Sequence, residues 1–363
     1  MKKIIFIADH SSHGGSLKMF TWLANSLSNY YDVTYCNLSN TKPFYELCDN
    51  VRYIQINTKR SRSFAVRNTV GFLNDIHNIR DTIKMGKYDL VINFADHALY
   101  ALLVAKKLDG FKVLLSQRVD PYSCTKRTDL FRLKLYRYFD GLVCQTDSAQ
   151  RYFETPEYDG INKAIIPNPA LGKANVCWSK DNNQGYILSL ARIDLEQKRQ
   201  DILVKAMITV HREYPEVKVK LYGKDVHGSL EKLRTLIGDL KLDDCVEYCG
   251  VTNDSHSVLA NARMMVLTSD YEGIPNAIIE AMEVGTPVIS TDCRPGGARL
   301  LIDTEDKGII VECNSPDKLA DAIIHYLRFP DRAAECGANA HKSLDRFSED
   351  RITMQWRNLI ESL

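Results

Sequence analysis

The chain has 363 residues, of which 45% are apolar and 26% charged, and its formal net charge is +1. This composition excludes disordered and fibrous classes, and the length is that of about two globular domains. The charge is uneven: residues 1–170 hold 23 basic against 16 acidic side chains, a net of +7, and the remainder holds 24 against 30, a net of −6. Such asymmetry hints at different partners for the two halves.

Short apolar segments alternate with loops and amphipathic helices along the whole chain. Near-continuous apolar strands separated by helices predict parallel sheets that are covered on both faces. Right-handed crossovers turn two such series into two doubly wound α/β domains. The predicted strands are residues 4–8, 33–38, 51–56, 90–94, 113–116, 141–145 and 164–166 in the first half, and 186–190, 217–222, 246–249, 264–268, 287–290 and 309–311 in the second.

Proline, asparagine and glycine concentrate in residues 167–185, which predicts a linker between the domains. We therefore expect one Rossmann-like domain over residues 1–170 and a second over residues 171–345. Residues 346–363 are expected to form a final helix with Ser348 as its N-cap.

No apolar run approaches the roughly 18 residues of a membrane span, so we expect a soluble protein that is at most peripheral to a membrane. The apolar run before Asp9 is too short for a signal peptide and fits a first buried strand better. The ten cysteines include no Cys-x-x-Cys pair, which favours buried reduced thiols over disulfides or zinc ligands. Reduced thiols indicate a cytoplasmic location.

The segment 269–290 has the pattern of a strand end, a loop, a helix, a glycine cap and another strand. Pro275 suits the first turn of that helix, and Gly285 suits its C-terminal cap. Backbone N–H groups at the helix start, together with the helix dipole, favour an anion such as phosphate. Glu272 and Glu280 stand near this end, where they either accept hydrogen bonds from sugar hydroxyls or simply complement the dipole.

A second loop follows the predicted strand 186–190 and carries Arg192, with Lys198 at the expected start of the next helix. Ligands of open parallel sheets bind beyond the carboxyl ends of the strands, so both cations are expected at that edge. A diphosphate leaving group needs such partners, Arg through its forked geometry and Lys as a point charge. The alternative is a pair of ordinary surface cations.

Together these segments resemble glycosyltransferase family four, the retaining nucleotide-sugar transferases of GT-B fold. The family frame of Glu-Gly-x-Pro-Asn, Glu-Ala-Met and Gly-x-Pro-Val-Ile begins here at Glu272, with seven residues between Glu272 and Glu280, and the spacing of Arg192 and Lys198 also matches. The resemblance covers nearly the whole chain. It implies two Rossmann-like domains that face each other across a cleft, with the final helix crossing back onto the N-terminal domain.

The resemblance implies that Arg192 and Lys198 bind the donor diphosphate, that Glu280 holds the ribose, and that Glu272 binds the transferred sugar. Arg192, Lys198 and Glu272 would be the catalytic residues. Preorganised cations at the departing diphosphate lower the barrier directly. A front-face displacement with retention, with no metal and no cofactor, is implied. The complete donor-binding set is Gly15, Arg192, Lys198, Val251, Glu272, Gly273, Ile274, Pro275, Asn276 and Glu280.

The N-terminal half is expected to bind the acceptor. Gly14 and Gly15 follow the first strand, where glycines either allow close approach of a phosphate or merely form a turn. Residues 116–121, Ser-Gln-Arg-Val-Asp-Pro, lack the histidine that many family members carry nearby, and they resemble bacterial polysaccharide and lipid-linked-oligosaccharide transferases. His97 is either a cleft residue or a structural histidine. The acceptor-side candidates are His13, Gly14, Ser16, His97, Arg118 and Asp120.

Two stretches of the positive half, residues 59–67 and 126–139, are both basic and aromatic. They either lie on anionic lipid, which suits a polyprenyl-pyrophosphate-linked acceptor, or form half-buried helices with solvated faces. No nucleic-acid motif is present, so no nucleic-acid partner is expected.

The sequence thus predicts a hexosyltransferase (EC 2.4) that moves a hexose or N-acetylhexosamine from a nucleotide sugar, expected to be UDP-linked, to a glycan or lipid-linked glycan. The expected setting is bacterial surface polysaccharide synthesis, as in lipopolysaccharide or capsule, at the inner face of the cell membrane. The alternatives are another enzyme of the fold, such as an epimerase or a phosphorylase, and a non-catalytic binder of nucleotide sugars or glycans. An epimerase would lack the Glu272 frame, and a phosphorylase would need a longer chain with a pyridoxal-phosphate lysine.

Overall fold

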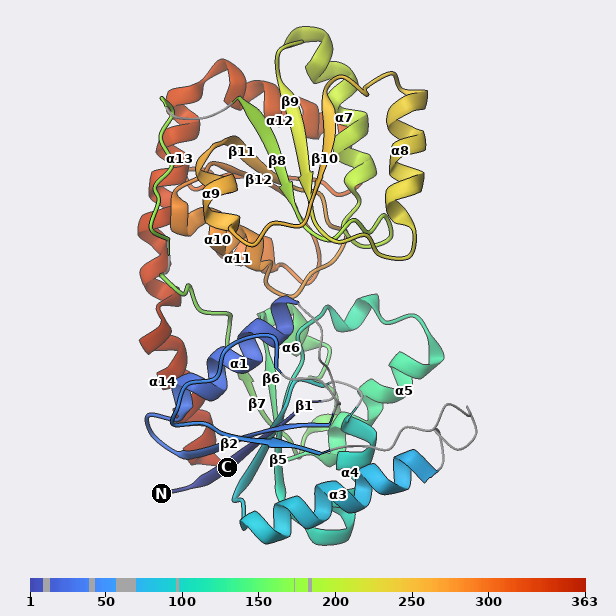
Figure 1. The fold of residues 1–363 in the computed structure, drawn as a ribbon, viewed down its shortest axis with the longest axis vertical. Coiled ribbons are helices and arrows are strands. Elements are labelled where there is room, and N and C mark those ends of the chain that lie inside the picture. Colours follow the sequence, from blue (N-terminus) through green and yellow to red (C-terminus); the bar gives the residue numbers. More distant parts are fainter. Residues whose placement is uncertain (9–13, 39–42, 57–69, 96–97, 173, 182–184) are drawn as a thin grey trace. The chain divides into compact units, whose positions relative to one another are not determined.

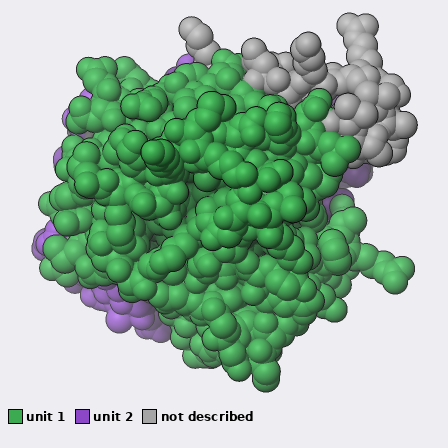
Figure 2. All heavy atoms as spheres, turned by 90° about the horizontal axis from the view of Figure 1, so that it is seen from below, with its two compact units in different colours: residues 1–167, 350–363 green, residues 168–349 purple. Residues whose placement is uncertain are grey.

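The computed structural model of the protein describes residues 1–8, 14–38, 43–56, 70–95, 98–172, 174–181 and 185–363 (Figure 1). The chain forms two compact units, coloured separately in Figure 2. Unit 1 comprises Met1–Pro167 and Asp350–Leu363, and unit 2 comprises Asn168–Glu349. Among the described residues, no helix combines the length and apolar character that crossing a membrane requires.

Unit 1 is built on a seven-stranded sheet in the order β3-β2-β1-β4-β5-β6-β7, and each neighbouring pair is parallel. The central strands are buried on both faces, which is why their sequences are continuous apolar runs. The strands are β1 (Lys3–Ala8), β2 (Asp32–Asn37), β3 (Arg52–Gln55), β4 (Leu90–Asn93), β5 (Lys112–Ser116), β6 (Gly141–Cys144) and β7 (Asn162–Ile165).

Helices cover this sheet, and the last of them comes from the C-terminus of the chain. Trp356 on that helix is 1% exposed, and its ring stacks on Phe94 with centroids 6.2 Å apart. The helices are α1 (Gly15–Leu27), α3 (Val70–Gly86), α4 (Leu99–Asp109), η1 (Pro121–Ser123), α5 (Arg127–Leu135), η2 (Tyr136–Tyr138), α6 (Asp147–Arg151), η3 (Pro156–Tyr158) and α14 (Glu349–Ser362).

Unit 2 is built on a six-stranded parallel sheet in the order β10-β9-β8-β11-β12-β13. Successive residues of a strand point to opposite faces, so Met264 and Met265 of β11 belong to two different apolar clusters. Its elements are β8 (Tyr186–Leu190), α7 (Gln200–Glu213), β9 (Lys218–Tyr222), α8 (Ser229–Asp239), β10 (Val246–Gly250), α9 (Ser255–Ala260), β11 (Ala262–Leu267), α10 (Asn276–Val284), β12 (Val288–Thr291), α11 (Gly297–Leu301), β13 (Ile309–Val311), α12 (Pro316–Arg328), α13 (Pro330–Lys342) and η4 (Ser343–Phe347).

The prediction of two Rossmann-like parallel-sheet domains is confirmed, and every predicted strand is present within a few residues of its expected bounds. The division into units differs slightly from the expected one, because unit 2 begins at Asn168 rather than at 171. The backbone explains this difference, since Ala170 N donates to Phe347 O at 2.8 Å and ties the segment to unit 2. The final helix begins at Glu349, because residues 343–347 form η4.

Candidate functional site

Two neighbouring strands of unit 2 lead into the predicted donor residues. Arg192 follows β8 and Glu272 follows β11, and these two strands are adjacent and parallel. Their carboxyl ends therefore meet at one edge of the sheet, where open α/β sheets bind ligands. Val251, which follows β10 and is 57% exposed, belongs to the same edge.

Lys198 and Glu272 form an ion pair, although 74 positions separate them in the chain. Their side chains are only 14% and 9% exposed. Ser269 Oγ donates to Glu272 Oε1 at 2.6 Å, and Glu272 N donates to Arg294 O at 2.8 Å. Burying two charges costs free energy that their attraction often fails to recover. A contribution to folding stability is therefore a weaker explanation for this ion pair than a requirement for fixed charges at this end of the sheet.

Arg192 is more exposed, at 52% of its side chain, and lies beside Asp194 with 3.6 Å between Nη2 and Oδ2. Its Nη2 also donates to Gln197 Oε1 at 2.7 Å, and Gln197 Nε2 donates to Tyr271 O at 3.0 Å. Gln197 therefore joins the loop that carries Arg192 to the loop that carries Glu272. Gln200 holds the backbone of Arg192, since its Nε2 donates to Arg192 O at 2.6 Å.

The start of α10 is the third part of the site. Residues 272–275 are buried, whereas Asn276 and Glu280 are partly exposed. Asn276 and Glu280 are four residues apart on one helix, so they share a face. Pro275, at the N-cap, makes no side-chain cap, and Ile278 N already donates to Pro275 O at 3.0 Å, so the amides of Asn276 and Ala277 are the ones that can face an anion.

Two further residues shape the donor loop from outside its own sequence. A Cβ on Gly297 would lie 1.8 Å from Gly273 O, so the start of α11 approaches the loop as only glycine permits. Burial raises the pKa of the Cys293 thiol above its usual value, and the charge of Glu272 adds to this effect. Cys293 is therefore a neutral neighbour of the ion pair.

Arg199, next to Lys198, shows why a cation in a loop does not by itself indicate a ligand site. It pairs with Asp201 at 3.0 Å and with Asp270 at 2.8 Å. The hydrogen bond to Asp201 is the main cause that raises the pKa of Arg199 further above its ordinary value. These bonds hold the loop that carries Arg199.

The acceptor-side candidates belong to unit 1. Gly14 and Ser16 lie where α1 begins after β1, on either side of Gly15 from the predicted donor set, and Arg118 and Asp120 follow β5. His13 and His97 lie outside the described residues.

The two candidates after β5 already have structural contacts. Arg118 donates to Ser116 Oγ at 3.2 Å and stacks over Phe94 at 4.6 Å. Asp120 is fully buried and caps η1, because its Oδ1 accepts from Tyr122 N at 3.0 Å. Asp120 thus has a local structural role that its sequence context did not reveal.

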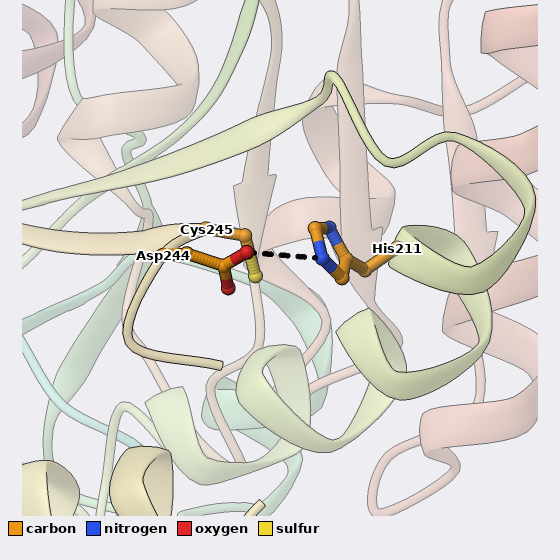
Figure 3. A group of neighbouring side chains, drawn as sticks. All are labelled: His211, Asp244 and Cys245. Carbon is orange, nitrogen blue, oxygen red and sulfur yellow. Dashed lines mark ion pairs between the residues drawn. The ribbon is translucent and has the colours of Figure 1, made fainter. Parts of the chain in front are cut away.

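Metal ligands were not predicted, and among the described residues one group has suitable chemistry: His211, Asp244 and Cys245 (Figure 3). Its ligand atoms lie within 4.8 Å of one another. Burial raises the pKa of Cys245 to about 11, which opposes the thiolate that a metal needs. Asp244 and Cys245 precede β10, whereas the donor residues follow parallel strands of the same sheet. The group therefore lies at the amino ends of the strands, and the predicted donor residues lie at their carboxyl ends.

The family model described as "Glycosyl transferases group 1" matches residues 177–343, which include every predicted donor residue except Gly15. An uncharacterized glycosyltransferase of Haemophilus influenzae is 22% identical, over 99% of this chain and 100% of its own length. An alpha-1,4-N-acetyl-D-galactosaminyltransferase of Campylobacter jejuni, whose name includes a glycan linked to PP-undecaprenol, is 23% identical over 99% of this chain and 98% of its own.

The fold is also found in solved structures. Anabaena HepE, solved in complex with UDP and glucose, superposes with a TM-score of 0.84 at 19% identity and covers 100% of both chains. At this identity the likeness shows the fold. The family match and the curated relatives extend it to the enzyme class.

Proposed function

Because the chain is a glycosyltransferase of the GT-B fold, we propose that it transfers a hexose or N-acetylhexosamine from a UDP-sugar to a lipid-linked glycan acceptor in bacterial surface polysaccharide synthesis. The acceptor class is supported by the Campylobacter relative, and UDP is supported by the ligand of Anabaena HepE. A cytoplasmic enzyme at the inner face of the cell membrane fits such an acceptor.

The observation that carries this proposal is the grouping of Lys198, Glu272 and Arg192 beside the start of α10. Lys198 has three N–H donors, so it can donate one hydrogen bond to a phosphate oxygen while another continues to be donated to Glu272. Glu272 retains a second oxygen for a hydroxyl of the transferred sugar. Glu280, which lies on α10 one turn beyond Asn276, is assigned to the ribose.

The chemistry that we propose is a front-face displacement with retention. The bond between the anomeric carbon and the donor phosphate breaks, the acceptor oxygen bonds to that carbon from the same face, and the departing diphosphate takes the acceptor proton. Negative charge then grows on the diphosphate, where Arg192, Lys198 and the first amides of α10 oppose it. In this proposal these groups provide the positive charge that a metal ion provides in other enzymes.

Binding to a panel of UDP-, GDP- and ADP-sugars, followed by turnover with the donor that binds, tests the proposal. We expect one UDP-sugar to bind and to be hydrolysed slowly or transferred. Lys198→Ala and Glu272→Ala should each lower turnover about 100-fold or more, the usual scale for losing a group that stabilises the transition state. Lys318→Ala, on the surface beside Glu312, is the matched control. Binding without any turnover would favour a non-catalytic binder, and no binding at all would refute the proposal.

A further inference from the structure

Asn168 is the first residue of unit 2, and it is only 3% exposed. It stands between Pro167 and Pro169. Proline fixes its own φ and restricts the residue before it, so the backbone of Asn168 has few conformations to choose from. Its side chain is therefore held in place before any ligand arrives.

Two of its hydrogen bonds define the orientation of the Asn168 amide. Its Nδ2 donates to Ile274 O at 3.4 Å and to Asn276 Oδ1 at 2.7 Å. A backbone carbonyl can only accept, so the NH₂ end of Asn168 must face the donor loop. Asn276 must then turn its oxygen, and not its nitrogen, towards Asn168. These hydrogen bonds assign the orientation of both amides.

The consequence is that Asn276 offers its Nδ2 hydrogens elsewhere. No group among the described residues accepts from this nitrogen, and the residue is partly exposed at the first position of α10. We propose that Asn168 is a positioning residue that fixes the Asn276 amide so that its NH₂ end meets a phosphate or hydroxyl oxygen of the nucleotide-sugar donor. This inference rests on the proposed function.

The physical effect is a choice between attraction and repulsion. An outward NH₂ group donates to a phosphate oxygen of a nucleotide sugar, whereas an outward amide oxygen would repel that oxygen. Because the two ends of an amide have the same shape, only a hydrogen-bonding partner can select between them. Asn168 supplies that selection from 108 positions away in the chain.

Donor affinity of the full chain, measured by calorimetry with the UDP-sugar that binds best, tests the role of Asn168. Asn168→Ala should weaken donor binding about tenfold, the effect of one hydrogen bond at the upper end of the usual range. The matched control is Asn339→Ala, which removes an exposed asparagine whose Nδ2 donates to Asp306 O at 3.2 Å. The control should bind the donor as the wild type does.

A double-mutant cycle separates positioning from a general structural role. If Asn168 acts through Asn276, Asn168→Ala should change donor affinity no further in an Asn276→Ala background. An equal loss in both backgrounds would overturn the proposal. Should Asn168→Ala not fold, Asn168→Asp provides a second test, because its carboxylate accepts where Asn168 donated and should turn the Asn276 NH₂ inward and its oxygen outward. It should bind the donor more weakly than Asn276→Ala, and equal affinities would refute the inference.

The two proposals fail in different ways. If the wild type binds no nucleotide sugar, the proposed function fails. If the wild type binds a donor and Asn168→Ala binds it equally well, the positioning role fails and the proposed function stands.

Discussion

Glu272 depends on Ser269 for the position of its carboxylate. The hydroxyl is fully buried and donates to Oε1, the same oxygen that pairs with Lys198. We expect Ser269→Ala to lower kcat about five- to tenfold, because a net loss of roughly 1 kcal/mol lets the carboxylate leave the geometry that the transition state needs. Steady-state kinetics with saturating donor measures this change.

Ser290→Ala is the matched control, since Ser290 on β12 is also fully buried and its hydroxyl, among the described residues, bonds only to Thr291 O. If both variants lose the same activity, the effect is one of packing and the specific role of Ser269 is wrong.

At the same scale, the sequence identified charged residues better than it identified their partners. Arg192, Lys198, Glu272 and Glu280 stand in motifs with recognisable spacing, and the first three lie in one hydrogen-bonded network. Gln197 and Ser269 were missed, because neither type of residue signals a role until its partner is known. A polar side chain next to a motif residue is the only signal that could have pointed to them.

At the scale of elements, α5 and its neighbours form the basic stretch of unit 1 for which the sequence left two interpretations open, contact with anionic lipid or a half-buried helix with a solvated face. Phe131 is 57% exposed and Leu130 38%. Among the described residues, Lys126, Arg127 and Lys134 are exposed and have no carboxylate partner. We therefore expect Lys126→Glu, Arg127→Glu and Lys134→Glu together to lower the partition constant for anionic vesicles, measured by co-sedimentation, about 100-fold or more, because each basic side chain contributes about 1 kcal/mol near such a surface.

Two other basic residues of the same stretch are less available. Arg132 lies 3.8 Å from Asp129, and Arg137 pairs with Glu157. Arg137→Glu is therefore the matched control and should change vesicle binding less than Lys134→Glu does. Binding that is unchanged in the triple variant would remove the membrane part of the proposal.

At the scale of the whole molecule, α14 completes the core of unit 1 from the far end of the chain. Trp356 is buried against Phe94, and Tyr31 Oη donates to Glu361 at 2.7 Å. Trp356→Ala should destabilise unit 1 by about 3–5 kcal/mol, the usual cost of deleting a large buried aromatic side chain. Calorimetry should show two unfolding transitions, of which the transition of unit 1 moves to a lower temperature and the transition of unit 2 does not.

Donor binding should survive in that variant at temperatures where unit 2 stays folded, because every member of the predicted donor set except Gly15 lies in unit 2. Met354→Ala, at a position 58% exposed on the same helix, should leave both transitions in place. A single transition that shifts as a whole would show that the two units do not unfold separately.

The sequence by itself determined the strands and the class of the fold, because a strand that is buried on both faces must be apolar along its length. It also singled out the charged residues that we predict for the donor site, since glycine, proline and glutamate at fixed spacing describe one loop and one helix. These are properties of residues close together in the chain.

Only the tertiary structure decided which distant residues meet. The sheet order places β8 beside β11, and this neighbourhood brings Lys198 to Glu272 and Gln197 to Tyr271. The same holds for Asn168. The sequence pattern predicts that it is part of a linker, whereas its side chain donates hydrogen bonds to Ile274 O and Asn276 Oδ1. Such contacts depend on three-dimensional neighbours, and no pattern along the chain encodes the direction in which an amide or a hydroxyl will find its partner.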